Sequence, residues 1–274
     1  MKVIEIKTSR GLAKSGLPEY DYALNPYLGC QHACRYCYAK DFTRGEPGEH
    51  WGEVIYVKIN LPEVLAREVR TYKPGVVGIS TITDPYQPIE AKYRLTRRSL
   101  EVLLQAGFRA SIQTKSTYVL KDMDLLFVYR DRVDVGITIT TYREETARLL
   151  EPKAPPPRAR AYALHMLSEL GVKTWVFLGP LLQGVNDGEE DYAPILEVAK
   201  KTKSEVTIDR YRPRPGADSM LSALGLKPRV DRSWWAEKAR EIKARCVELG
   251  VVCRTADEEW SAARRRADDL RRYL

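Results

Sequence analysis

The segment VVGISTIT, residues 76–83, sets the expectation for the fold, because it is short, apolar and rich in β-branched residues. Buried strands of parallel sheets have this composition. The segment LTRRSLEVLLQAG, residues 95–107, follows, and its leucines share one helical face until Gly107 ends the pattern. A second strand pattern, RASIQTKS at residues 109–116, comes next. The three segments predict a strand–helix–strand unit.

The same alternation continues in both directions along the chain. Further strands are expected at residues 22–27, 133–141, 173–182 and 205–212, and further helices begin near residues 60, 122, 157, 191 and 234. About six strand–helix units in a row predict an α/β fold with a parallel sheet. An open doubly wound sheet and a complete or partial barrel both fit this pattern. In each case, ligands bind beyond the carboxyl ends of the strands.

Composition and charge narrow the class of protein. The 274 residues are 44% hydrophobic, and no apolar run approaches the ~20 residues of a transmembrane helix. The segment at residues 1–16 lacks the apolar region of a signal peptide, so we expect a cytoplasmic protein with no membrane partner. The net charge of +8 favours polyanionic partners such as nucleic acid.

The segment NPYLGCQHACRYCYAK, residues 25–40, contains three of the five cysteines. Cys30, Cys34 and Cys37 have the spacing C-x3-C-x2-C, and this odd, clustered set argues against a disulfide framework. A closed zinc site needs a fourth ligand, whereas an iron–sulfur cluster held by three thiolates leaves one iron open to another ligand.

The zinc alternative requires one more ligand from elsewhere in the chain. The available side chains are His32, His50, Cys246 and Cys253, and neither histidine has the paired spacing of common zinc modules. On this reading the chain is a non-catalytic nucleic-acid-binding protein with a structural metal.

The C-x3-C-x-Tyr-C pattern, with Tyr36 directly before Cys37, resembles the radical S-adenosylmethionine superfamily. The motifs STITDPYQP (80–88), EPKAP (151–155) and GPLLQGVND (179–187) follow in the order found in its spore-photoproduct-lyase-related group, whose members are often labelled DNA repair photolyases. The resemblance spans about residues 20–212. It implies a partial (β/α)6 TIM-type barrel and a single domain over residues 1–274, extended by C-terminal helices at residues 213–274.

This resemblance also implies cofactors and chemistry. Cys30, Cys34 and Cys37 would hold a [4Fe–4S] cluster whose open iron binds S-adenosylmethionine. An electron from a low-potential donor, ferredoxin or flavodoxin, would then yield a 5′-deoxyadenosyl radical. The expected substrate is a nucleic-acid base, and the alternative is a peptide or small metabolite.

The resemblance also assigns side chains to S-adenosylmethionine. Thr83, Asp84 and Lys115 match positions that line its methionyl group, and Thr140 is expected at the ribose or the methionyl group. Glu151 and Arg160 would fix ribose or carboxylate, or alternatively form an ion pair that closes a loop onto a helix. The complete set expected at the cofactor is Tyr36, Thr83, Asp84, Lys115, Thr140, Glu151 and Arg160.

One feature of the lyase is missing. Spore photoproduct lyase quenches its product radical with a hydrogen atom from a cysteine three residues before the matched aspartate. Thr81 occupies that position here. A hydroxyl O–H bond is too strong for the same role. The candidates for a donor or relay are Tyr86, Cys246 and Cys253. The alternative for the two cysteines is core packing, because Cys246 falls on the apolar face of the helix expected at residues 234–250. A last amphipathic helix with an arginine-rich face is expected at residues 260–274.

Overall fold

The main sheet has eight strands, seven of them parallel. The computed structural model describes residues 1–227, 229 and 231–263. The strand order is β11-β10-β9-β8-β7-β6-β3-β2, with only β2 antiparallel to its neighbour. The strands of this sheet are β2 (Ala13–Lys14), β3 (Tyr22–Leu24), β6 (Val76–Ile79), β7 (Arg109–Thr114), β8 (Val133–Thr138), β9 (Lys173–Leu181), β10 (Glu205–Arg210) and β11 (Cys253–Thr255). Because β2 and β11 do not pair with each other, the barrel stays open, as expected for a partial (β/α)6 barrel.

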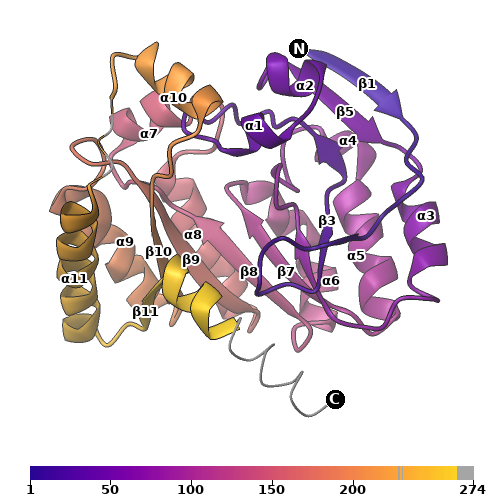
Figure 1. The fold of residues 1–274 in the computed structure, drawn as a ribbon. Helices are drawn as coiled ribbons and strands as arrows, with labels where there is room; N and C mark the ends of the chain where they lie inside the picture. Colours follow the sequence, from indigo (N-terminus) through magenta and orange to yellow (C-terminus); the bar gives the residue numbers. More distant parts are fainter. Residues whose placement is uncertain (228, 230, 264–274) are drawn as a thin grey trace.

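Helices cover the outer face of this curved sheet (Figure 1). The covering helices are α3 (Leu61–Glu68), α5 (Leu95–Gln105), α6 (Met123–Val128), α8 (Pro157–Glu169), α9 (Glu189–Lys201) and α11 (Arg232–Leu249). The inner rows of α5, α8 and α9 pack against β7, β8, β9 and β10. Leucine, isoleucine and valine side chains from both layers are fully buried between them, which makes this interface the main core.

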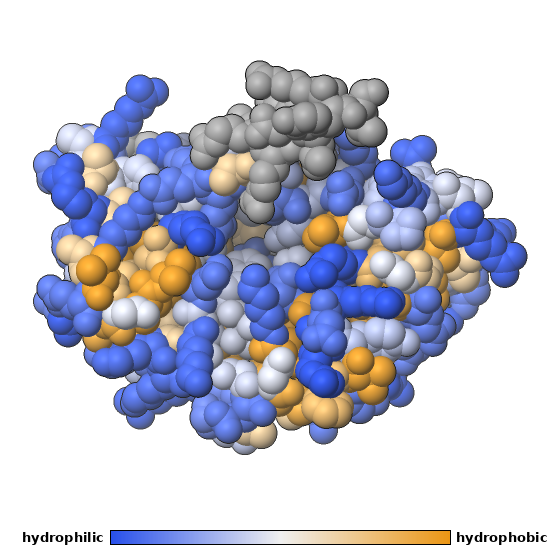
Figure 2. Space-filling view, turned by 90° about the horizontal axis from the view of Figure 1, so that it is seen from below, coloured by the Kyte–Doolittle hydropathy of each residue, from blue (hydrophilic) through white to orange (hydrophobic). Residues whose placement is uncertain are grey.

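A smaller sheet and several short helices surround the carboxyl ends of the strands. The small sheet has the order β1-β5-β4, from β1 (Lys2–Ile6), β5 (Val54–Lys58) and β4 (Tyr27–Leu28). The short helices are α1 (Ala39–Phe42), α2 (Glu46–Glu49), α4 (Glu90–Tyr93), the 3-10 turn η1 (Thr117–Asp122), α7 (Glu144–Leu150) and α10 (Pro215–Ser222). The opposite end of the molecule is mostly hydrophilic, and its hydrophobic residues form separate patches (Figure 2). Within the described ranges, no helix combines the length and the apolarity needed to cross a membrane.

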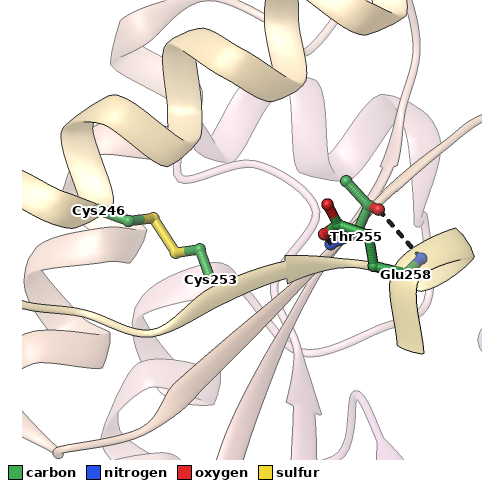
Figure 3. Close-up of a disulfide and its surroundings, with 4 residues drawn as sticks. All are labelled: Cys246, Cys253, Thr255 and Glu258. Atoms are coloured by element: carbon green, nitrogen blue, oxygen red, sulfur yellow. Dashed lines mark hydrogen bonds between the residues drawn. A yellow bond between two sulfur atoms is a disulfide. The ribbon is translucent and has the colours of Figure 1, made fainter. Parts of the chain in front are cut away.

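The C-terminal region contains a strand as well as the expected helices. β11 pairs in parallel with β10, and residues 256–263 then form helical turns. Thr255 and Glu258 cap these turns reciprocally, since Glu258 N donates to Thr255 Oγ1 (3.3 Å) and Thr255 N donates to Glu258 Oε2 (2.9 Å) (Figure 3). Trp260 Nε1 donates to Glu19 Oε1 (3.1 Å), so these helical turns contact the loop between β2 and β3. The expected arginine-rich face at residues 264–274 lies outside the described residues.

The expectation that Cys246 and Cys253 are free core thiols is wrong. Cys246, buried on α11, forms a disulfide with Cys253 at the start of β11 (Figure 3). The helical periodicity correctly placed Cys246 on the inner face of α11. It gave no sign that a seventh parallel strand would bring Cys253 against that face.

Candidate functional site

The three remaining cysteines lie in the loop between β4 and α1. Cys30 and Cys34 are buried and Cys37 is partly buried, and all three are free thiols. Two tight turns shape the loop, because Ala33 N donates to the carbonyl of Cys30 and Cys37 N to that of Cys34, each at 3.3 Å. Ala33 adopts φ = 54°, the left-handed conformation that such a sharp turn requires. The three thiols line one cavity.

This cavity sits where parallel-sheet folds bind ligands. Its wall includes Thr81, Lys115 and Thr138, each at or just beyond the carboxyl end of β6, β7 or β8. The cavity volume is about 130 Å³. One water molecule needs only ~10–15 Å³ on the same measure, so the cavity has room for a sizeable ligand group. Of the side chains expected at the cofactor, Thr83, Asp84 and Lys115 line it.

Charge in the cavity is set by burial and by one lysine. Burial raises the pKa of all three thiols, that of Cys34 to about 12, although Lys115 acts against the shift at Cys34 and Cys37. The protein alone therefore favours neutral thiols, and a bound metal cation would have to replace the protons. Burial favours a neutral Lys115, but Cys34, once deprotonated, and the Glu151 carboxylate raise its pKa, so Lys115 stays an ammonium.

Asp84 joins the cysteine loop to the end of β7. Its carboxylate accepts hydrogen bonds from Thr114 Oγ1 (2.7 Å), Lys115 N (2.8 Å) and Tyr86 N (2.9 Å). His32 Nδ1 lies 3.3 Å from Asp84 Oδ2. Burial opposes ionisation of Asp84, but His32 and the donated hydrogen bonds lower its pKa to about 2. Asp84 is thus an ionised carboxylate fully engaged with protein donors.

Thr83 and Gln87 dock the TDPYQP segment onto the cysteine loop. Thr83 Oγ1 donates to the carbonyl of Gly29 (2.6 Å), and Gln87 Nε2 donates to Thr83 Oγ1 (2.9 Å). Gln87 Oε1 accepts from Gln31 N (2.8 Å), and Gln87 has no exposed surface. These bonds hold the loop that carries Cys30 against the carboxyl end of β6.

Four of the side chains expected at the cofactor come together behind the cavity wall. They are Tyr36, Thr140, Glu151 and Arg160. Arg160 Nη2 lies 2.5 Å from Glu151 Oε2, and both residues are almost fully buried. Burial raises the pKa of Glu151, but the Arg160 guanidinium outweighs this effect and the pKa falls to about 2. Thr140 Oγ1 donates to Glu151 (2.8 Å), as does the Tyr36 hydroxyl. None of the four lines the cavity. The structure therefore has the ion pair that was the alternative for Glu151 and Arg160, and it anchors Tyr36, next to Cys37.

The candidates for hydrogen return are not at this cavity. Tyr86 is fully buried and donates to Asp122 Oδ2 (3.0 Å), and it does not line the cavity. Cys246 and Cys253 are joined in the disulfide of Figure 3, which removes both as thiol donors in this state. Thr81, in contrast, does line the cavity.

Two residues that line the cavity were not predicted as site residues from the sequence. Trp51 and Ser80 line the cavity, and Trp51 Nε1 and Ser80 Oγ are buried without a hydrogen-bond partner among the described residues. Buried polar groups are normally paired, so two orphaned donors in one wall indicate a ligand. Ser80 could have been found, because it directly follows β6. Trp51 lies far from any motif, and no sequence signal pointed to it.

The donor set fits an iron–sulfur cluster better than a zinc ion. Thiolates are the usual ligands of such clusters, and three free thiols surround this cavity. Among the described residues, no three His, Cys, Asp or Glu side chains gather around a point as ligands of a single ion do. Of the four proposed fourth ligands, Cys246 and Cys253 are bonded to each other, and His50 is exposed and outside the cavity lining. His32 does line the cavity, with its Nδ1 directed to Asp84.

A partial parallel barrel with three free thiols at the carboxyl ends of its strands defines the class of protein as a cofactor-dependent barrel enzyme. Residues 24–193 match the family model of the Radical SAM superfamily, and the chain belongs to this superfamily. Membership implies an iron–sulfur cluster and S-adenosylmethionine as cofactors.

Relatives and solved structures agree with this assignment. An uncharacterized protein of Methanocaldococcus jannaschii is 34% identical over 69% of this chain and 71% of its own length. An uncharacterized protein of Acidianus two-tailed virus is 34% identical over 84% of this chain and 77% of its own. The Radical SAM Nalpha-GlyT isomerase of Pseudomonas phage M6 is 24% identical over 58% of this chain and 33% of its own. Spore photoproduct lyase complexed with dinucleoside spore photoproduct has the same fold, with a TM-score of 0.67 at 16% identity, covering 92% of this chain and 82% of that one.

Proposed function

We propose that this enzyme holds a [4Fe–4S] cluster on Cys30, Cys34 and Cys37 and modifies or repairs a nucleic-acid base. The observation that carries the cluster assignment is the convergence of three free thiols on one cavity at the carboxyl ends of the strands. When bound there, the cluster and S-adenosylmethionine supply a 5′-deoxyadenosyl radical that abstracts hydrogen from the substrate. A low-potential donor, ferredoxin or flavodoxin, would provide the electron.

The protein's own residues bind and orient. The Lys115 ammonium faces the cavity beside the thiols and suits the carboxylate of the S-adenosylmethionine methionyl group. Asp84 fixes the backbone of Lys115 through the bond from Lys115 N. Thr83 holds the cysteine loop at Gly29, and the buried Glu151–Arg160 pair holds it from behind through Tyr36. Thr140, Glu151 and Arg160 are therefore positioning residues in this proposal.

The product radical must be quenched by a different group from the one expected in spore photoproduct lyase. All five cysteines are accounted for, three at the cavity and two in the disulfide. Thr81 stands at the cavity where the lyase has its cysteine, and its hydroxyl is a poor hydrogen-atom donor. The proposed reaction is therefore one whose product radical is not quenched by a cysteine thiol.

The nucleic-acid substrate rests on charge and kinship. The chain carries a net charge of +8, which favours a polyanion. Spore photoproduct lyase was solved with a dinucleoside photoproduct, and a phage relative is called a Nalpha-GlyT isomerase. The test is anaerobic turnover of the reconstituted enzyme with S-adenosylmethionine and dithionite in the presence of single-stranded DNA, RNA, free nucleosides or mixed peptides. We expect polynucleotide to raise the rate of 5′-deoxyadenosine formation over the Cys34→Ala control. Stimulation by peptide alone would assign the enzyme to the peptide alternative.

A further inference from the structure

An aromatic and cationic surface lies at the mouth of the cavity. Tyr38 lines the cavity, yet 46% of its surface is exposed, so it marks the place where the cavity opens. Phe42 lies one helical turn further along α1, with its ring centroid 6.0 Å from that of Tyr38 and the rings at 77°. The Arg214 guanidinium lies over the Phe42 ring, 5.1 Å from its centroid. These three side chains form a ladder that leads outward from the cavity.

The ladder is held by the surrounding fold. Gly216 N donates to Asp41 Oδ1 (2.8 Å), which ties α10 to α1 next to both Phe42 and Arg214. Met220 of α10 packs against the apolar cluster around Cys30. In Figure 1, α1 and α10 lie together at the upper end of the molecule. Phe42 is nevertheless 53% exposed, so the surrounding fold leaves its ring accessible.

The charge of this surface suits a polyanion. Arg214 lies over Phe42, and Lys40 and Arg44 lie two residues before and after Phe42 in the sequence. Among the described residues, none of these three cations has a carboxylate within 4.0 Å. Asp41 is engaged with Gly216 N, and Asp218 of α10 accepts from the Tyr211 hydroxyl (2.7 Å). Exposed aromatic rings beside unpaired cations are the arrangement with which proteins bind single-stranded nucleic acid, because bases stack on the rings and phosphates contact the cations.

We propose that the Tyr38–Phe42–Arg214 ladder binds the nucleotides next to the one inside the cavity, so that the substrate is a single-stranded polynucleotide and not a free nucleoside. This inference rests on the proposed function, because it presupposes a nucleobase in the cavity. Stacking of a neighbouring base on Phe42 would keep the strand in place while one base enters the cavity. Lys40 and Arg44 would contact its phosphates.

The chain offers a matched control. Phe127 is 48% exposed and has the Arg130 guanidinium 4.8 Å from its ring centroid, like the pair of Phe42 and Arg214. Phe127 lies near the end of α6, six residues before β8 begins, and therefore near the amino ends of the strands, away from the cavity. Phe42→Ala and Phe127→Ala thus remove the same kind of exposed, arginine-capped ring from opposite ends of the molecule.

The test measures binding of a labelled 12-nucleotide single strand and of a free nucleoside to the anaerobically reconstituted protein, by fluorescence anisotropy and competition. We expect Phe42→Ala to weaken oligonucleotide binding by about 5- to 150-fold, the effect of losing one stacked base. Phe42→Leu should weaken it similarly, because leucine keeps apolar bulk without a stacking face. Phe127→Ala should leave it unchanged, and nucleoside binding should not differ among the variants. Arg214→Gln should reduce the slope of the logarithm of the oligonucleotide-binding constant against the logarithm of the salt concentration by about one.

Each other outcome is informative. Equal oligonucleotide affinity for Phe42→Ala and Phe127→Ala would overturn this inference and leave the proposed function standing. Failure of the unmodified protein to bind any strand would overturn both. If Phe42→Ala slowed reduction by flavodoxin while oligonucleotide binding stayed intact, the ladder would be a docking site for the electron donor, and the inference would be wrong.

Discussion

Breaking the buried ion pair behind the cysteine loop should lower the stability of the fold. In Arg160→Met, the guanidinium is lost while most of the side-chain volume remains. Glu151 would keep its bonds from Tyr36 and Thr140 but lose the cation at 2.5 Å. Breaking a buried pair by removing one partner costs about 3–5 kcal/mol. Lys115 Nζ remains 4.0 Å from Glu151, which favours the lower end of that range.

Thermal unfolding measures this cost. For a chain of this size each kcal/mol lowers Tm by about 2–4 °C, so Arg160→Met should lower Tm by roughly 6–20 °C. The matched control is Arg158→Met on the same helix. Arg158 forms an ion pair with Glu144 at 3.7 Å, and both side chains of that pair are exposed. Exposed pairs contribute about 0–1 kcal/mol, so its Tm should barely move. The double variant Glu151→Leu with Arg160→Met should recover most of the loss, since no buried charge is left unpaired.

Acid provides a second readout of the same pair. The folded-state pKa of Glu151 is lowered to about 2, below its ordinary value of 4.5. The stability that this carboxylate contributes is therefore present above about pH 4.5 and is lost as the pH falls toward 2. Arg160→Met should show a smaller acid loss over that window. If Arg160→Met and Arg158→Met unfolded at the same temperature, the reasoning about the buried pair would be refuted.

Three further predictions concern other parts of the structure. Asp84→Asn should lower the free energy of unfolding by about 1.5–3 kcal/mol in urea at pH 7, because charged acceptor bonds are lost. The difference should shrink as the pH falls from 3.8 toward 2, the pKa to which Asp84 is lowered; an equal difference at both pH values would contradict the assignment. Replacing Cys246 and Cys253 together by Ser should cost about 2.5 kcal/mol, given the sequence separation of 7, with iron content unchanged; a loss of iron would contradict the separation of the two cysteine sets. Burial raises the pKa of Glu90 to about 7, so the NMR signal of its carboxyl carbon should titrate near neutral pH. The free energy of unfolding should therefore fall as the pH rises from about 4.5 to 7. Titration near 4.5 would contradict the burial of Glu90.

Much of the fold could be predicted from local patterns. The β-branched run at residues 76–83 contains β6 in its first half (Val76–Ile79), and the periodic segments after it are the helices that cover the sheet. The small sheet and β11 could not be predicted, because β1, β5 and β11 form through partners that are distant in the sequence. The disulfide between Cys246 and Cys253 was missed for the same reason, since it depends on where β11 pairs.

Part of the candidate site could also be predicted from the sequence, and part could not. The spacing of Cys30, Cys34 and Cys37 and the strand-end position of Lys115 were sufficient to place them at one cavity. A motif match could not separate residues that line the cavity from those that support its wall: Glu151, expected at the cofactor, does not line the cavity and pairs with Arg160. His32 was considered only as a metal ligand, although its neighbour in the structure is Asp84.

The most direct test of the central claim is 5′-deoxyadenosine formation by the anaerobically reconstituted, dithionite-reduced protein with S-adenosylmethionine. Cys34→Ala removes a cavity thiol, and Cys246→Ser with Cys253→Ser removes the two cysteines outside it. We expect the product from the unmodified chain and from the double serine variant, and none from Cys34→Ala. If the unmodified chain carried a full complement of iron and sulfide and still formed no 5′-deoxyadenosine, the assignment of this cavity as a site of radical formation would be contradicted.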